Sequence, residues 1–169
     1  MSTVSLPWRG ALLLLGLIER STNDLDIVAQ LDESGTLRAD PLPPPLREAV
    51  ADVARALDLA PDWLNPGPGS LLDLGLPVGF AERAHVRRFG ALEIRLADRV
   101  DQIYFKLYAS VDQGPESKHF ADLRALEPTR EELLSAAGWA QTHDPSEGFR
   151  AELEATLEAF GARGTDGQR

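Results

Sequence analysis

Two carboxylates, Asp24 and Asp26, lie one residue apart at the start of an apolar, β-prone segment. If residues 24–31 form a strand, both side chains project from the same face, because the side-chain period of a strand is two residues. At a rise of roughly 3.3 Å per residue, they would lie about 6–7 Å apart. Two acidic groups on one face repel each other unless a cation lies between them. The pair therefore indicates a site for Mg²⁺ or Mn²⁺, hard cations that prefer oxygen ligands and bind nucleotide phosphates.

The same spacing also has a purely structural explanation. A D-x-D pattern is short and occurs by chance, and an aspartate at the start of a strand can simply cap a preceding helix or turn. The spacing of Asp24 and Asp26 leaves both interpretations open.

A single charge, Lys106, interrupts the apolar segment Ile103–Ala109. A helix this apolar is expected to be largely buried, and lysine is rarely buried without a partner. The Lys106 side chain must therefore extend until its ammonium reaches solvent, pair with a carboxylate, or face a cleft. Asp122 is a candidate partner, although it also lies four residues after Lys118, where the two would form a weak surface ion pair.

The composition excludes several classes of site. The chain of 169 residues has no cysteine, so disulfides and thiolate metal sites are excluded, and its three histidines do not form a zinc-binding pattern. The formal net charge is −10, so the chain as a whole does not attract nucleic acid. Five arginines nevertheless form either a local basic patch or a solvated strand-and-loop surface. They are Arg83, Arg87, Arg88, Arg95 and Arg99.

Residues 11–18 form an apolar segment that is shorter than the roughly 20 residues needed to span a bilayer. Glu19 and Arg20 follow it, where a signal peptide would have small residues. A buried helix in a cytoplasmic protein that makes no membrane contact is therefore expected. If that helix is exposed instead, its leucines offer a patch through which two copies of the chain could form a homodimer.

Periodicity and capping signals predict an α+β chain with a helical C-terminal half. Thr129 and Glu132 have the spacing of a capping box, and Trp63 is expected to anchor a Pro- and Gly-rich loop in the core. Helices are expected at 11–20, 46–59, 98–112, 117–126, from 129 onward and from about 146 to 160. Strands are expected at 24–31 and in a hairpin of 84–89 and 91–97. We expect one domain over residues 1–160 and a polar, disordered tail over 161–169.

Four segments, taken in order, resemble the nucleotidyltransferase superfamily. Gly10 leads into an apolar helix, and Arg20–Asp26 resembles the R-S/T-x-D-[hydrophobic]-D pattern. Lys106–Ala109 has the form K-x-x-A, and Lys118–Leu123 has the form K/R-x-x-x-D-L. The likeness runs from about residue 9 to 126 and is closest to small bacterial nucleotidyltransferase-like proteins related to the AbiEii and MenT toxin group.

The resemblance implies a mixed β-sheet flanked by helices, with Mg²⁺ on Asp24 and Asp26. It implies a nucleoside triphosphate whose phosphates pack against the turn at Gly10, with Arg20 and Thr22 in the same binding site. Many members carry a third metal-binding carboxylate on a later strand. Glu93 is the best candidate for that position.

The resemblance also implies the reaction. An acceptor hydroxyl would attack the α-phosphate and release pyrophosphate, while Lys106 contacts the triphosphate and Asp122 orients Lys106 or acts as a base. The acceptor would be an RNA such as tRNA, a protein side chain or a small molecule. In a toxin–antitoxin system, a cognate antitoxin would be a protein partner. The four residues Asp24, Asp26, Lys106 and Asp122 are then expected to converge in one cleft.

Two departures from the family pattern keep other interpretations open. Arg9 occupies a position where the superfamily has a small residue beside the phosphates. Only Met1–Trp8 precede the turn, and Pro7 would disrupt a central strand, so the first strand of the sheet is expected to be missing or vestigial. The alternatives are an inactive nucleotidyltransferase-like domain that acts through protein contacts, or an unrelated α+β domain.

Overall fold

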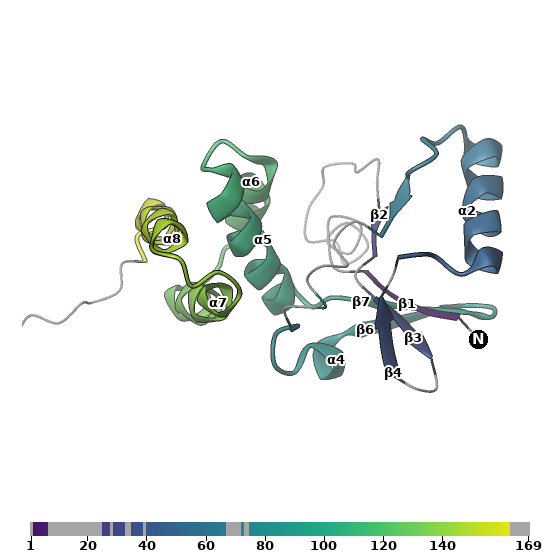
Figure 1. Cartoon of the computed structure of the whole chain (residues 1–169), viewed down its shortest axis with the longest axis horizontal. Coiled ribbons are helices and arrows are strands. Elements are labelled where there is room, and N and C mark those ends of the chain that lie inside the picture. The colour runs from purple at the N-terminus through teal and green to yellow at the C-terminus, as the bar shows by residue number, and fades with distance from the viewer. Residues whose placement is uncertain are drawn as a thin grey trace, which may run out of the picture. The chain divides into compact units, whose positions relative to one another are not determined.

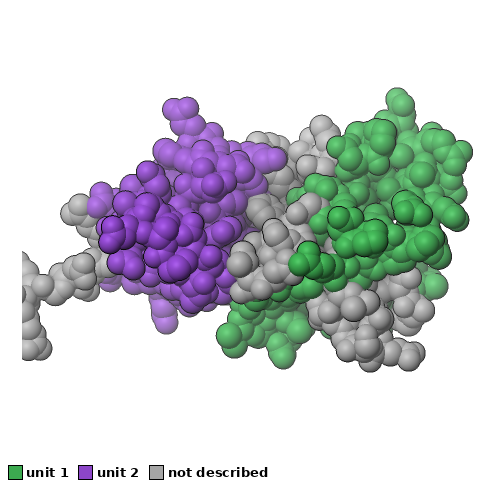
Figure 2. Space-filling view, in the orientation of Figure 1, with its two compact units in different colours: residues 1–98 green, residues 99–169 purple. Residues whose placement is uncertain are grey.

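The structure is a computed structural model that describes residues 2–6, 25–27, 29–32, 35–38, 40–66, 72 and 75–162. The chain divides into two compact units, Met1–Asp98 and Arg99–Arg169 (Figure 2). Strands lie in unit 1 and the C-terminal helices form unit 2, so the α+β class and the helical C-terminal half are confirmed. The single domain expected over residues 1–160 stays a prediction. The helix expected at 11–20 and the tail from residue 163 lie outside the described residues.

The main sheet of unit 1 is mixed and has the strand order β4-β3-β1-β7-β6 (Figure 1). Its central strand, β1 (Ser2–Leu6), pairs in parallel with β7 (Leu92–Leu96) and antiparallel with β3 (Ala29–Asp32). The expectation of a missing or vestigial first strand was therefore wrong. The described strand ends at Leu6, whose register partner is Leu96 of β7.

The strand expected over residues 24–31 is divided between two sheets. Its first part, β2 (Leu25–Asp26), pairs in parallel with β5 (Leu64–Asn65) in a separate two-stranded sheet, whereas β3 belongs to the main sheet. The backbone nitrogens of Leu25 and Ile27 donate to the carbonyls of Trp63 and Asn65 at 2.6 and 2.8 Å. This pairing with a distant loop separates the two parts, and periodicity alone cannot indicate it.

The outer strands of the main sheet come from hairpins. β4 (Gly35–Arg38) pairs with β3, and β6 (His85–Phe89) pairs antiparallel with β7. Gly90, in the turn between β6 and β7, has a φ of +59°, a conformation that glycine adopts without strain. The hairpin predicted around Gly90 is confirmed.

Helix α2 (Pro44–Leu57) covers the apolar side of this sheet. Prolines occupy its first turn, where their missing amide hydrogens remove no helical hydrogen bond. On this helix Val50 is buried, whereas Leu57 is 67% exposed. Ile27 and Leu96 are fully buried at the centre of the core, and partly buried residues pack against them: Leu42, Leu46, Leu64, Leu92 and Ile94. A short helix, α4 (Phe80–Arg83), precedes the β6–β7 hairpin.

The described part of unit 2, residues 99–162, contains four consecutive helices. They are α5 (Arg99–Gln113), α6 (Lys118–Ala125), α7 (Arg130–His143) and α8 (Glu147–Ala159). α5 contacts the other three, and its aromatic residues pack around Trp139 of α7 at ring-centroid distances of 5.7 to 6.0 Å. The predicted capping box of Thr129 and Glu132 is present. Within the described residues, no helix has the length and apolar character needed to cross a membrane.

Candidate functional site

The strongest candidate for chemistry in unit 2 is the ion pair between Lys106 and Asp122. The Lys106 ammonium donates to Oδ2 of Asp122 at 3.0 Å, so α5 and α6 are joined by opposite charges. Lys106 is 0% exposed and Asp122 is 4% exposed. The predicted pairing is confirmed, and the alternative in which Lys106 reaches solvent is wrong. Lys118, the other neighbour of Asp122 considered above, lies exposed on α6.

The local sequence explains why the two charges meet. Eight of the other ten residues from Asp101 to Val111 of α5 are also buried, so Lys106 has no route to water along its own helix. On α6, the Ser117 side chain accepts from the Phe120 amide and caps the helix. The cap fixes the start of a short helix whose buried face carries Asp122.

Other buried polar groups lie on the same two helices. Gln102 and Ser110 lie one helical turn to either side of Lys106, and the Ser110 hydroxyl donates to the Lys106 carbonyl at 2.5 Å. His119 lies on α6 and is also buried. Neither polar atom of the Gln102 amide has a hydrogen-bond partner within the part of the chain that the structure describes. Sequence analysis missed Gln102, although its position four residues before Lys106 could have drawn attention to it.

In unit 1, Asp26 is half-buried at the end of β2. Its Oδ1 accepts from the Asn65 amide at 3.2 Å, and the two residues are directly paired in the β2–β5 ladder. Carboxylate and amide oxygens are ligands that suit Mg²⁺. Asn65 was missed because a partner in a short, non-local parallel pairing leaves no local sequence signal. Its neighbours in the sequence are prolines and other loop-forming residues.

The remaining residues of the predicted site fall outside the described part of the chain. They are Gly10, Arg20, Thr22 and Asp24. Asp26 belongs to unit 1, and Lys106 and Asp122 belong to unit 2. The expected convergence of the four catalytic residues in one cleft therefore stays a prediction.

Glu93, expected as a third metal ligand, is buried on β7 and paired with two arginines. Its Oε2 accepts from Arg88 at 2.9 Å and its Oε1 accepts from Arg95 at 3.2 Å. The hydrogen bond from Arg88 is the main reason that the pKa of Glu93 lies below its ordinary value. Both oxygens are thus engaged by cations. Within the described residues, no group of three or more His, Cys, Asp or Glu side chains is placed to hold a metal ion.

Four of the five arginines in this segment have hydrogen-bond partners within the chain. Arg88 and Arg95 are paired with Glu93, and the Arg83 guanidinium donates to the Val78 carbonyl at 2.8 Å. Arg99 donates to Oε1 of Glu132 at 2.6 Å and also bonds to carbonyls near the end of α6. Most of these guanidinium groups therefore bond to nearby carboxylates and carbonyls, and whether the segment also forms a basic patch stays a prediction.

Comparisons with known proteins provide no relative for this chain. No family model, no curated protein and no solved structure matches it.

Proposed function

We propose that the protein transfers a nucleoside monophosphate from a nucleoside triphosphate to an acceptor hydroxyl, with Asp24 and Asp26 holding Mg²⁺. The observation that carries this proposal is the buried ion pair of Lys106 and Asp122. A buried ion pair contributes little more stability than a well-packed apolar pair. A chemical role, in phosphate binding or proton transfer, therefore accounts for these charges better than fold stability does.

The metal part of the proposal rests on the chemistry of the donor atoms. Asp26 and its neighbour Asn65 offer only oxygen as a ligand, which suits Mg²⁺ and not a soft metal. When bound, Mg²⁺ would neutralise negative charge on the phosphate oxygens. Asp24 and Asp26 would hold it.

The reaction balances without a further reagent. The acceptor oxygen forms a bond to the α-phosphorus, the bond from that phosphorus to the oxygen bridging to the β-phosphate breaks, and pyrophosphate leaves. The Lys106 ammonium supplies positive charge to the triphosphate, and Asp122 fixes the position of that ammonium. The proton of the acceptor hydroxyl passes to a base. Asp122 is a candidate for that base, as an alternative to its role in positioning Lys106.

A transfer assay tests the proposal. The full chain is incubated with Mg²⁺, each α-labelled nucleoside triphosphate, total RNA and a protein lysate. We expect label on one acceptor class with the wild type, none with Asp26→Asn, and unchanged label with Asp62→Asn, an exposed aspartate of the same unit. The labelled acceptor would show whether RNA, protein or a small molecule is modified. Absence of label with the folded wild type would refute the proposal.

A second candidate is an inactive domain that acts through protein contacts, for example with an antitoxin. The observation in its favour is that Asp26, Glu93 and Lys106 all have partners inside the protein. Lys106 in particular has no exposed surface. Nucleotide binding separates the two candidates, because the inactive domain should give no calorimetric heat with a nucleoside triphosphate at millimolar Mg²⁺. Saturable, Mg²⁺-dependent binding would exclude it.

A further inference from the structure

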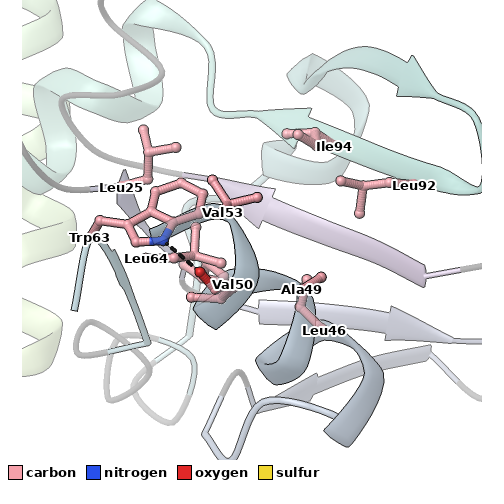
Figure 3. Close-up of a pocket in the computed structure, with 10 residues that line it drawn as sticks. Leu25, Leu46, Ala49, Val50, Val53, Trp63, Leu64, Leu92 and Ile94 are labelled. Carbon is pink, nitrogen blue, oxygen red and sulfur yellow. Dashed lines mark hydrogen bonds between the residues drawn. The ribbon is translucent and has the colours of Figure 1, made fainter. Parts of the chain in front are cut away.

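Unit 1 contains an apolar pocket whose lining shares no residue with the proposed reaction, although Leu25 and Ile27 of the lining flank Asp26. It has a volume of about 160 Å³ and lies between α2 and the β7 side of the main sheet (Figure 3). Leu46, Ala49, Val50 and Val53 enter it from α2, and Leu92 and Ile94 enter it from β7. Strands β2 and β5 contribute leucines from the adjoining small sheet.

The lining offers no hydrogen bond to an occupant. Its side chains are all hydrocarbon except for the indole of Trp63. The single polar atom of that ring, Nε1, donates to the Val50 carbonyl at 3.0 Å, as the dashed line in Figure 3 marks. A charged or strongly polar ligand would lose its hydration here without compensation, so the pocket selects for an uncharged and apolar group. Ordered water, which needs polar partners, is disfavoured for the same reason.

The size of the pocket limits the occupant further. An apolar protein cavity of roughly 150 Å³ stays free of water and accommodates benzene. A single aromatic ring therefore fits a pocket of about 160 Å³, which is open to solvent on one side.

Apolar side-chain surface remains exposed to solvent at the pocket. Leu46, Leu64 and Ile94 are only partly buried, although each packs against the fully buried Ile27 and Leu96. Ala49 is exposed on α2 at the edge of the pocket, so a small molecule can enter from solvent. A ring in the pocket would remove further leucine and isoleucine surface from water, which favours binding.

From these observations we propose that the pocket of unit 1 is a binding site for a small, uncharged, monocyclic aromatic compound. The site is independent of the nucleotidyl-transfer proposal, because it uses none of the same residues. Its hydrocarbon lining selects an apolar ligand, and its volume of about 160 Å³ accommodates a single ring.

Methyl NMR of the full-length protein tests the site with toluene as the probe. Toluene should shift the methyl signals of Ile94, Leu64 and Val50 saturably. The signal of Leu153, buried in unit 2, should not move. Benzoate, which has the same ring with a charge, should cause no shift. Absence of a saturable shift with toluene, or an equal response to benzoate, would overturn the proposal.

A matched pair of variants locates the binding. Ala49→Phe fills the mouth of the pocket and should weaken toluene binding about tenfold or more. Ala51→Phe makes the same change on the opposite face of α2, because two residues correspond to roughly 200° of helical rotation, and should leave binding unchanged. Val53→Phe provides a second blocking variant if Ala49→Phe does not fold. Equal affinity in the blocked and unblocked proteins would place toluene elsewhere and refute the site.

Discussion

The Lys106 ammonium and the Asp122 carboxylate lie 3.0 Å apart, and the pair has almost no exposed surface. The two residues are 16 positions apart in the sequence and lie on different helices. Neither charge can reach water along its own helix, so each depends on the other. Their mutual dependence makes the pair a structural element as well as a candidate for chemistry.

Removal of only one partner should therefore be costly. Lys106→Met leaves the Asp122 carboxylate buried without its cation and should lower the free energy of unfolding by about 3–5 kcal/mol. Urea denaturation followed by circular dichroism measures the change. Lys118→Met, the same substitution at an exposed lysine of α6, should change it by less than about 0.5 kcal/mol.

The double variant Lys106→Met/Asp122→Leu separates stability from chemistry. Replacement of both charges by apolar side chains should recover most of the stability that the single variant loses. Transfer activity should not recover with it. A stable double variant with full activity would show that the ion pair has no chemical role.

The role of Asp122 can be tested through the pH profile of transfer. In Asp122→Asn the amide oxygen can still accept from Lys106, but the buried ammonium loses its counter-charge and gives up its proton more easily. We expect the Asp122→Asn variant to keep transfer activity at neutral pH. As pH rises, its activity should decline at a lower pH than that of the wild type, because Lys106 loses its proton earlier. If Asp122 is the base instead, the substitution should lower transfer by about 10²–10⁴-fold and remove the acidic limb of the profile.

Stability in acid should depend on Glu132. Hydrogen bonds from Arg99 are the main reason that the pKa of Glu132 lies below its ordinary value of 4.5, and burial opposes them. The folded state binds this proton more weakly than the unfolded chain does. The stabilisation is therefore complete above about pH 4.5 and is lost as pH falls through the lower pKa of the folded state.

Glu132→Gln tests this dependence, because glutamine can still complete the capping box but cannot form the ion pair with Arg99. The variant should be less stable than the wild type by about 1–2 kcal/mol at pH 7, and the difference should shrink in acid. Glu131→Gln, at an exposed neighbour, should show no such trend. A difference that stays constant down to pH 3 would contradict the assignment.

The start of α8 depends on Ser146, whose side chain accepts from the Phe149 amide at 3.2 Å. Ser146→Ala removes this cap and should cost about 1 kcal/mol in thermal or urea unfolding. Ser146→Asp, which keeps a capping oxygen, should be close to the wild type. Equal loss in both variants would show that the cap is not the cause.

Elements that depend on local signals could be predicted from the sequence. The capping box at Thr129 and the glycine turn at Gly90 both act within a few residues, and each lies where expected. The ion pair of Lys106 was predictable for a different reason. A lone charge in an apolar helix requires a partner, and Asp122 was a carboxylate within reach.

Elements that depend on distant pairing could not be predicted. The central strand β1 is defined by its partners in β3 and β7, and β2 is defined by β5. The environment of Glu93 was partly predictable, because a hairpin turning at Gly90 places Arg88 directly opposite it. That register favours an ion pair over a metal ligand. The two units and the Trp63 pocket depend on packing that no local pattern encodes.

The most direct test of nucleotidyl transfer compares an α-labelled and a γ-labelled nucleoside triphosphate in parallel reactions. Wild-type protein is incubated with Mg²⁺, an acceptor fraction and a nucleoside triphosphate labelled on either the α- or the γ-phosphate. The account predicts that α-label enters the acceptor, that γ-label is released as pyrophosphate, and that Asp26→Asn abolishes both. Transfer of γ-label to the acceptor, or no release of pyrophosphate by the folded wild type, would contradict it.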